Sequence, residues 1–292
     1  MIASASACDP RISVVIPCRD RIGYLKRALK SVFQQTVEPG EIIVVDDGSE
    51  KPLQQSISEE FPDVRWIRQS NAGVSSARNS GIREASNDWV AFLDSDDRWK
   101  PEKLELQMEF HLKHPRVEIS HTDEIWIRND NQVIPPKYLD KNPQFLFERS
   151  LERCLICPSS VIVHQNLLDR VGNFDESLPV CEDYDLWLRI LMKEEFGFID
   201  QPLTFKHGGH ADQLSKSFWG MDRFRTHTLE KLLKLNDSAS KNKLILQTLI
   251  KKYRVLAQGY EKRGKIMEAK TYKEKFQIHS SSLEALASNQ VQ

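Results

Sequence analysis

The sequence predicts an α/β fold with a doubly wound, mostly parallel sheet, followed by a C-terminal α-helical extension. Two observations carry this prediction. Over about the first hundred residues, short apolar runs of strand length alternate with helical patterns, as in chains of βαβ units. From about Trp219 onward the strand signals stop, and leucine clusters at helical spacing take their place.

The strands of the first half are expected where runs rich in Val, Ile and Leu lie between polar turns. These strands are residues 11–17, 41–46, 64–69 and 89–93. The helices between them are expected where apolar residues recur at i, i+3 and i+4, as in Leu25, Leu29 and Val32. These helices are residues 22–33, 52–61 and 75–85. No G-x-G-x-x-G motif follows the first strand and no Walker lysine motif is present, which disfavours dinucleotide-binding and P-loop folds.

The second half combines shorter signals of both kinds. The expected helices are residues 102–114, 145–151, 165–171 and 182–191, and the expected strands are residues 117–121, 124–128, 159–164 and 198–205. Near the end of the chain, two helical patterns separated by Gly264 predict a helix-turn-helix pair.

The fractions of hydrophobic and charged residues are those of an ordinary folded protein. The 292 residues are 40% hydrophobic and 28% charged, with a formal net charge of −1, which gives no case for a nucleic-acid partner. No apolar run approaches the roughly 18 residues that span a bilayer. Residues 1–10 lack the basic start and apolar middle of a signal peptide, so we expect a flexible N-terminus.

The five cysteines indicate a reducing compartment, since they are few and odd in number. We therefore expect a cytoplasmic protein without a disulfide framework. Cys154 and Cys157 form a C-x-x-C pair, but a structural zinc site is disfavoured because no second pair is present.

A carboxylate cluster follows the fourth expected strand. Asp94, Asp96 and Asp97 stand where ligands bind in an open parallel sheet, at the carboxyl ends of the strands. Close carboxylates repel one another and raise each other's pKa, and a bound divalent cation removes this repulsion. Oxygen ligands suit Mg²⁺ or Mn²⁺. The alternative is a solvated acidic turn that caps the next helix, because Asp-x-Asp by itself is frequent by chance.

Several segments in order resemble one enzyme family. They are Ser13–Pro17, Val44–Ser49, Ala77–Ile82, Phe92–Asp97, Gly172–Glu176 and Glu182–Leu188. Together they resemble the inverting family-2 glycosyltransferases with the GT-A nucleotide-sugar-binding fold. The resemblance implies a GT-A domain at residues 11–217, between the flexible N-terminus at 1–10 and a helical C-terminal extension at 218–292 that lies outside the match.

The resemblance implies a nucleotide-diphospho-sugar donor. A UDP-sugar is favoured, because Asp46 would accept a hydrogen bond from the uracil N–H. The other donor-binding residues would be Pro17, Cys18, Arg19, Arg78, Asp94 and Ser95. The cofactor, Mn²⁺ or Mg²⁺, would be held by Asp96, Asp94 and His207 and would neutralise charge on the leaving diphosphate. Arg78 has an alternative role in a structural ion pair, and Asp97 is equally suited to capping the following turn.

The resemblance also implies the catalytic pair. Asp183 would take the proton of the acceptor hydroxyl as it attacks the anomeric carbon, and Glu182 would orient Asp183 or contact the acceptor. Attack opposite the leaving diphosphate inverts the anomeric centre in one displacement. The alternative for this pair is helix capping, since acidic residues suit a helix N-terminus. Lys206 stands where the family often has arginine, and lysine lacks the bidentate fork.

The expected acceptor is a glycan or lipid-linked glycan of cell-envelope or exopolysaccharide synthesis. Two other functions stay open: another nucleotide-sugar enzyme, such as a nucleotidyltransferase, and a catalytically silent sugar-nucleotide-binding module with an interaction tail. The segment from about Trp219 onward is rich in basic residues and has leucines at helical spacing. It either packs on the catalytic domain or binds a partner or the membrane surface. In the last case the protein would associate peripherally with the inner face of the membrane.

Overall fold

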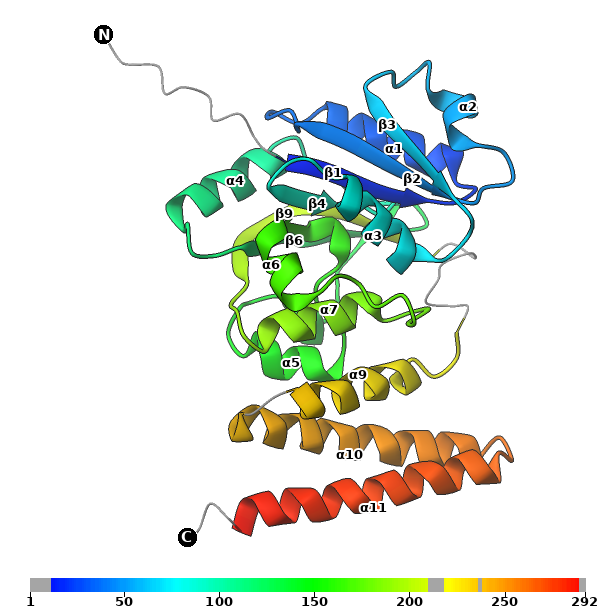
Figure 1. Ribbon diagram of the computed structural model, residues 1–292, viewed down its shortest axis with the longest axis vertical. Coiled ribbons are helices and arrows are strands. Elements are labelled where there is room, and N and C mark those ends of the chain that lie inside the picture. Colours follow the sequence, from blue (N-terminus) through cyan, green and yellow to red (C-terminus); the bar gives the residue numbers. More distant parts are fainter. Residues whose placement is uncertain (1–11, 210–217, 236–237, 289–292) are drawn as a thin grey trace. The chain divides into compact units, whose positions relative to one another are not determined.

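The computed structural model describes residues 12–209, 218–235 and 238–288 (Figure 1). The flexible N-terminus expected at residues 1–10 lies outside the described residues. The chain divides into two compact units. The first comprises Met1–Pro143, Ile156–Pro179 and Glu194–His210, and the second comprises Gln144–Leu155, Val180–Lys193 and Ala211–Gln292. Two short segments that precede residue 217 are therefore grouped with the C-terminal helices.

The sheet of the first unit is parallel in its N-terminal half, as predicted. Its strands are β1 (Ile12–Cys18), β2 (Glu41–Asp47), β3 (Val64–Gln69) and β4 (Trp89–Phe92). They lie in the order β3-β2-β1-β4, and each pair is parallel. All seven residues of β1 are buried, because a central parallel strand is covered on both faces. The carboxyl ends of these strands consequently share one edge of the sheet.

Beyond β4 the sheet is mixed. Its remaining strands are β5 (Arg98–Trp99), β6 (Ile119–Arg128), β7 (Asn131–Val133), β8 (Val161–His164) and β9 (Gly197–Gly208). Only the β6–β9 pair is parallel among the described pairings of these five strands. The prediction of two strands at 117–121 and 124–128 was wrong, since β6 is continuous. Its register against β9 shifts between Thr122 and Glu124, which explains the interrupted pattern.

Helices cover both faces of the parallel half. They are α1 (Ile22–Phe33), α2 (Leu53–Ile57), α3 (Val74–Glu84), α4 (Lys103–Lys113) and α6 (Gln165–Val171), with short 3₁₀ turns η1 (Lys137–Leu139) and η2 (Pro158–Ser160). Val14 of β1 belongs to the core cluster with Leu25 of α1, and Val45 of β2 belongs to a second cluster with Ala77 of α3. This two-sided core is the doubly wound arrangement that the sequence predicted.

The second unit is helical. Its helices are α5 (Leu146–Glu152), α7 (Glu182–Leu191), α9 (Asp222–Leu235), α10 (Ala239–Glu261) and α11 (Ile266–Ser288). The predicted helix-turn-helix pair is present in α10 and α11, which turn at Gly264 with φ 70°. Tyr260 stacks on Tyr272 across this pair, with ring centroids 5.4 Å apart. Among the described residues, no helix is both long and apolar enough to cross a membrane.

Candidate active site

The loop after β1 brings the first predicted donor-binding residues to the carboxyl edge of the sheet. Cys18, the last residue of β1, lies opposite Asp46 of β2 in the parallel register. Burial raises the pKa of the Cys18 thiol to about 11, so Cys18 is a packed, neutral thiol next to Ser95. Arg19 is about half exposed. Asp20 has a left-handed φ of 54° and accepts a 2.7 Å hydrogen bond from the Glu50 N–H, which ties this loop to the loop after β2.

Asp46 fixes the turn that follows β2. Its carboxylate accepts hydrogen bonds from the N–H groups of Ser49 (2.9 Å) and Leu53 (3.1 Å) and pairs with Arg68 at 2.8 Å. Burial alone would raise the pKa of Asp46, but the hydrogen bonds from Ser49 and Leu53 and the charge of Arg68 outweigh it and lower this pKa. Asp46 is therefore an ionised carboxylate that holds the turn after β2. Its hydrogen bond to the uracil base of a donor stays a prediction.

The acidic loop after β4 is held by two arginines. Arg78 of α3 is buried and pairs with Asp94, with 2.7 Å between Nη2 and Oδ1. Arg21, which sequence analysis did not single out, pairs with Asp96 at 3.1 Å. The ion pair weighed as an alternative for Arg78 is thus present. Asp94 and Asp96 keep 28% and 14% of their side-chain surface exposed, so both can still be reached by a ligand.

Ser159 connects the acidic loop to the rest of the sheet edge. Its hydroxyl accepts the Asp94 N–H at 3.0 Å and donates to Asp97 Oδ2 at 2.6 Å. Asp97 also accepts the backbone N–H of His207 at 2.8 Å. Burial, with Asp96 and Asp94 nearby, raises the pKa of Asp97 well above its ordinary value. Asp97 consequently holds the loop against β9 and is not itself open to a ligand.

His207 lies near the end of β9, opposite Ile127 of β6. Burial and the charge of Arg98 lower the pKa of His207, which favours the neutral imidazole. Its Nδ1 lies 3.2 Å from the Phe205 carbonyl oxygen and its Nε2 lies 3.4 Å from Arg98 Nη2. A neutral ring is the form that binds a metal, and coordination through Nε2 would replace the contact with Arg98. His210, a second histidine of this stretch, lies outside the described residues.

The acidic loop fits a metal that takes few protein ligands. Within the described residues, no group of three or more His, Cys, Asp or Glu side chains gathers closely enough to hold a metal ion. Asp94 and Asp96 nevertheless offer carboxylate oxygens, and both lie close enough to Asp97 to raise its pKa. Mg²⁺ is commonly bound through one or two carboxylates with phosphate oxygens and water completing the shell. The donor set therefore suits a metal that binds together with a diphosphate.

Glu182, Asp183 and Asp185 form the first turn of α7, in the second unit. Asp185 is fully buried and pairs with Arg189 at 2.7 Å and with Lys231 at 3.0 Å. Asp183 is half-buried and accepts only the Tyr184 N–H, at 2.7 Å, among the described residues. Cys181, directly before this turn, has a left-handed φ of 65°, a strained conformation that often occurs at functional sites. Of the two aspartates, Asp183 is the one without a cationic partner in the described part of the chain.

The fold and the acidic loop define an α/β protein with a carboxylate-rich loop at the carboxyl edge of its parallel strands, where open α/β sheets bind ligands. A family model described as "Glycosyl transferase family 2" matches residues 13–170, more than half of the chain. The chain therefore belongs to glycosyltransferase family 2.

Several of the similar proteins are named glycosyltransferases. An uncharacterized glycosyltransferase of Rickettsia felis is 31% identical over 198 residues, which are 67% of this chain and 33% of that protein. A chondroitin synthase of Escherichia coli is 27% identical over 184 residues, 62% of this chain and 26% of that protein. The chain thus spans about a third of the length of the Rickettsia felis relative.

Solved structures of the S. aureus protein TarS share the fold. A TarS fragment aligns with a TM-score of 0.64 at 17% identity, over 91% of each chain. The same fragment has been solved with UDP and with UDP-GlcNAc. This likeness confirms the predicted GT-A type of α/β fold.

Proposed function

We propose that this chain is an inverting, metal-dependent glycosyltransferase. It moves a sugar from a UDP-type nucleotide-diphospho-sugar to a hydroxyl of a glycan or lipid-linked glycan in cell-envelope or exopolysaccharide synthesis. The observation that carries the proposal is the loop from Asp94 to Asp97 at the carboxyl edge of the parallel strands, in a chain of glycosyltransferase family 2. The chondroitin synthase relative and the UDP-GlcNAc complex of TarS support the donor and acceptor classes.

The donor would be held by residues at the strand ends. Asp96 and Asp94 would bind Mn²⁺ or Mg²⁺, and the metal when bound supplies positive charge against the diphosphate. His207 would have to move to become a third ligand, because no three such side chains of the described residues gather closely enough to hold a metal. Arg78 orients Asp94 through their 2.7 Å ion pair. Pro17 and Cys18 at the end of β1, and Arg19 in the loop that follows, would contact the nucleotide, with Asp46 at the uracil base and Ser95 beside Cys18.

Asp183 is the proposed general base. One of its carboxylate oxygens accepts the proton of the acceptor hydroxyl while the hydroxyl oxygen bonds to the anomeric carbon. The bond between that carbon and the diphosphate oxygen breaks at the same time, so the anomeric centre is inverted. Glu182, which is buried beside Asp183, would orient the base or the acceptor. Asp185 is unsuited to this role because Arg189 and Lys231 already bind its carboxylate.

The decisive experiment measures turnover of the donor by the full chain. A panel of nucleotide sugars is incubated with the protein in Mn²⁺, in Mg²⁺ and in chelator, and released nucleoside diphosphate is quantified. Slow metal-dependent hydrolysis or transfer is expected, and Asp96→Ala should abolish it while the melting temperature stays near wild type. Binding of a nucleotide sugar without turnover would favour the silent module, and full activity of Asp96→Ala in chelator would refute the metal-dependent mechanism.

We further propose a cytoplasmic location with peripheral contact at the inner face of the membrane. Basic residues are frequent on the C-terminal helices, and basic amphipathic helices bind anionic lipid. Binding to phosphatidylglycerol vesicles should fall steeply with salt, because exposed charges are screened. Salt-independent binding, or none, would remove this contact from the proposal.

A further inference from the structure

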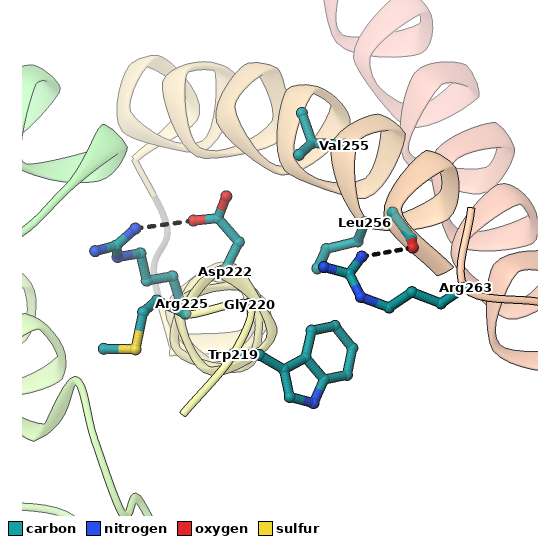
Figure 2. A pocket seen from close by; sticks show the side chains of 9 residues that line it. Trp219, Gly220, Asp222, Arg225, Val255, Leu256 and Arg263 are labelled. Atoms are coloured by element: carbon teal, nitrogen blue, oxygen red, sulfur yellow. Dashed lines mark hydrogen bonds and ion pairs between the residues drawn. The ribbon is translucent and has the colours of Figure 1, made fainter. Parts of the chain in front are cut away.

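The C-terminal helices line an open cavity for which the proposed transfer reaction has no role. The cavity has a volume of about 230 Å³ and lies between the segment that starts α9 and the C-terminal part of α10 (Figure 2). Trp219, Val255 and Leu256 contribute apolar walls, and Arg225 and Arg263 contribute guanidinium groups. All of these residues belong to the second unit, so the cavity is complete within one compact part of the chain.

Three cations converge on the indole ring at the cavity wall. Arg223, Arg263 and Lys265 lie over the Trp219 ring, at 4.1, 5.0 and 5.6 Å from its centroid. None of the three has a carboxylate partner among the residues that the structure describes. The ring quadrupole offsets part of their mutual repulsion. Positive charge is therefore in excess at the C-terminal end of α10, and a bound anion would neutralise it.

The carboxylate within the cavity lining does not cancel this surplus. Asp222 pairs with Arg225 at 3.0 Å and with Lys252 at 2.9 Å, so two cations already face its single charge. In Figure 2 the guanidinium group of Arg225 faces the carboxylate of Asp222. The guanidinium group of Arg263 lies across the cavity from Arg225 and is hydrogen-bonded to a backbone oxygen. That bond, from Arg263 Nη1 to the Gly259 carbonyl oxygen at 2.7 Å, uses one of the five donors of this guanidinium. The other donors of Arg263, which is an exposed side chain, are open to a ligand.

We propose that this cavity binds a phosphate ester. Arginine presents a planar fork of donors that matches phosphate oxygens, and Arg263 lines the cavity with such a fork. Arg223 and Lys265 do not line the cavity, but they add positive charge at the Trp219 ring that forms its wall. The volume is below the roughly 300–1,000 Å³ of pockets for drug-sized ligands, so it suits a headgroup-sized ester and not a long glycan segment. The carbon part of the ester packs against Trp219 and Val255, which are 39% and 59% exposed. The ester belongs either to a lipid headgroup or to a soluble compound.

The test compares two charge-neutralising variants of neighbouring residues in the full chain. Arg263→Gln removes a cation that lines the cavity, and Lys262→Gln removes an exposed cation that does not line it. Both variants change net charge equally, and their melting temperatures report whether they fold. The probes are glycerol 3-phosphate, measured by calorimetry, and phosphatidylcholine vesicles with and without phosphatidylglycerol, measured by co-sedimentation.

Arg263→Gln should weaken phosphate-ester binding by about tenfold or more, while Lys262→Gln leaves it within about twofold of wild type. Binding of glycerol 3-phosphate without vesicle binding assigns the site to a soluble ester. Vesicle binding that needs phosphatidylglycerol and is lost in Arg263→Gln assigns it to a lipid headgroup. Equal losses in the two variants, or no binding of either probe by the wild-type protein, would overturn the proposal. Neither result bears on donor turnover, which tests the transferase separately.

Discussion

Replacing Asp183 with asparagine should slow transfer without unfolding the protein. The substitution keeps the shape of the side chain and removes the proton acceptor. General-base catalysis contributes about 10²- to 10⁴-fold in rate, or roughly 3–5 kcal/mol at about 1.4 kcal/mol per decade. Stability should change by less than about 1 kcal/mol, because asparagine can still accept the Tyr184 N–H and the lost contact with the helix dipole is small.

Asp185→Asn is the matched control on the same helix turn. Its carboxylate is fully buried between Arg189 and Lys231, so neutralising it leaves two cations without their counter-charge. Breaking a buried pair costs about 3–5 kcal/mol, and we expect about 2–3 kcal/mol here because Lys231 is partly exposed. The two substitutions should therefore have different effects: Asp183→Asn should lower the rate of transfer, and Asp185→Asn should lower the free energy of unfolding.

The assay is single-turnover transfer, with donor affinity and melting curves measured on the same preparations. Donor affinity should stay near wild type in Asp183→Asn, since the proton is taken only during the transfer step. A variant that melts lower yet transfers at the wild-type rate would show that Asp183 only caps α7. If Asp185→Asn stays folded and loses transfer instead, the base must be reassigned to Asp185.

Three further predictions concern the structure around the site and the helices. Ser159→Ala removes the hydroxyl that joins Asp94 to Asp97, so the free energy of unfolding should fall by about 1–3 kcal/mol and UDP affinity should fall with it; unchanged affinity in calorimetry would contradict this. Burial alone would raise the pKa of Glu230, but its hydrogen bonds from Lys275 and Tyr253 lower it below the ordinary 4.5. Stability from Glu230 is therefore present above pH 4.5 and is lost as pH falls through the lowered folded-state pKa, and Glu230→Gln should flatten that acid limb in urea titrations; an unchanged limb would refute it. Gly81→Ala places a Cβ 2.3 Å from a methyl of Val15 and should cost about 1–3 kcal/mol, whereas Gly23→Ala, with open space around it on a helix, should not destabilise; equal melting temperatures would refute the packing argument.

Local sequence signals were sufficient for most regular elements. The strand at 64–69 and the helices at 22–33 and 165–171 have the bounds that the sequence predicted. Buried strands and amphipathic helices carry their signal in the residues themselves, since periodicity reflects which face is covered. The short strands β5 and β7 were not predicted, because two or three residues have no period to detect and depend on pairing with β9 and β6.

In the candidate site too, local sequence patterns located some features and tertiary packing decided others. The sequence by itself located the acidic loop and Asp46 at strand ends and the Glu182–Asp183 pair at a helix start, because local patterns mark these positions. The resemblance to family-2 glycosyltransferases implied the roles of Asp46 and of the pair. Only the tertiary structure decided which partners these side chains have. Arg21 pairs with Asp96, and Ser159 joins Asp94 to Asp97 across more than sixty positions of the chain. Such partners carry no local signal, because long-range packing, and not the spacing of residues, brings the groups together.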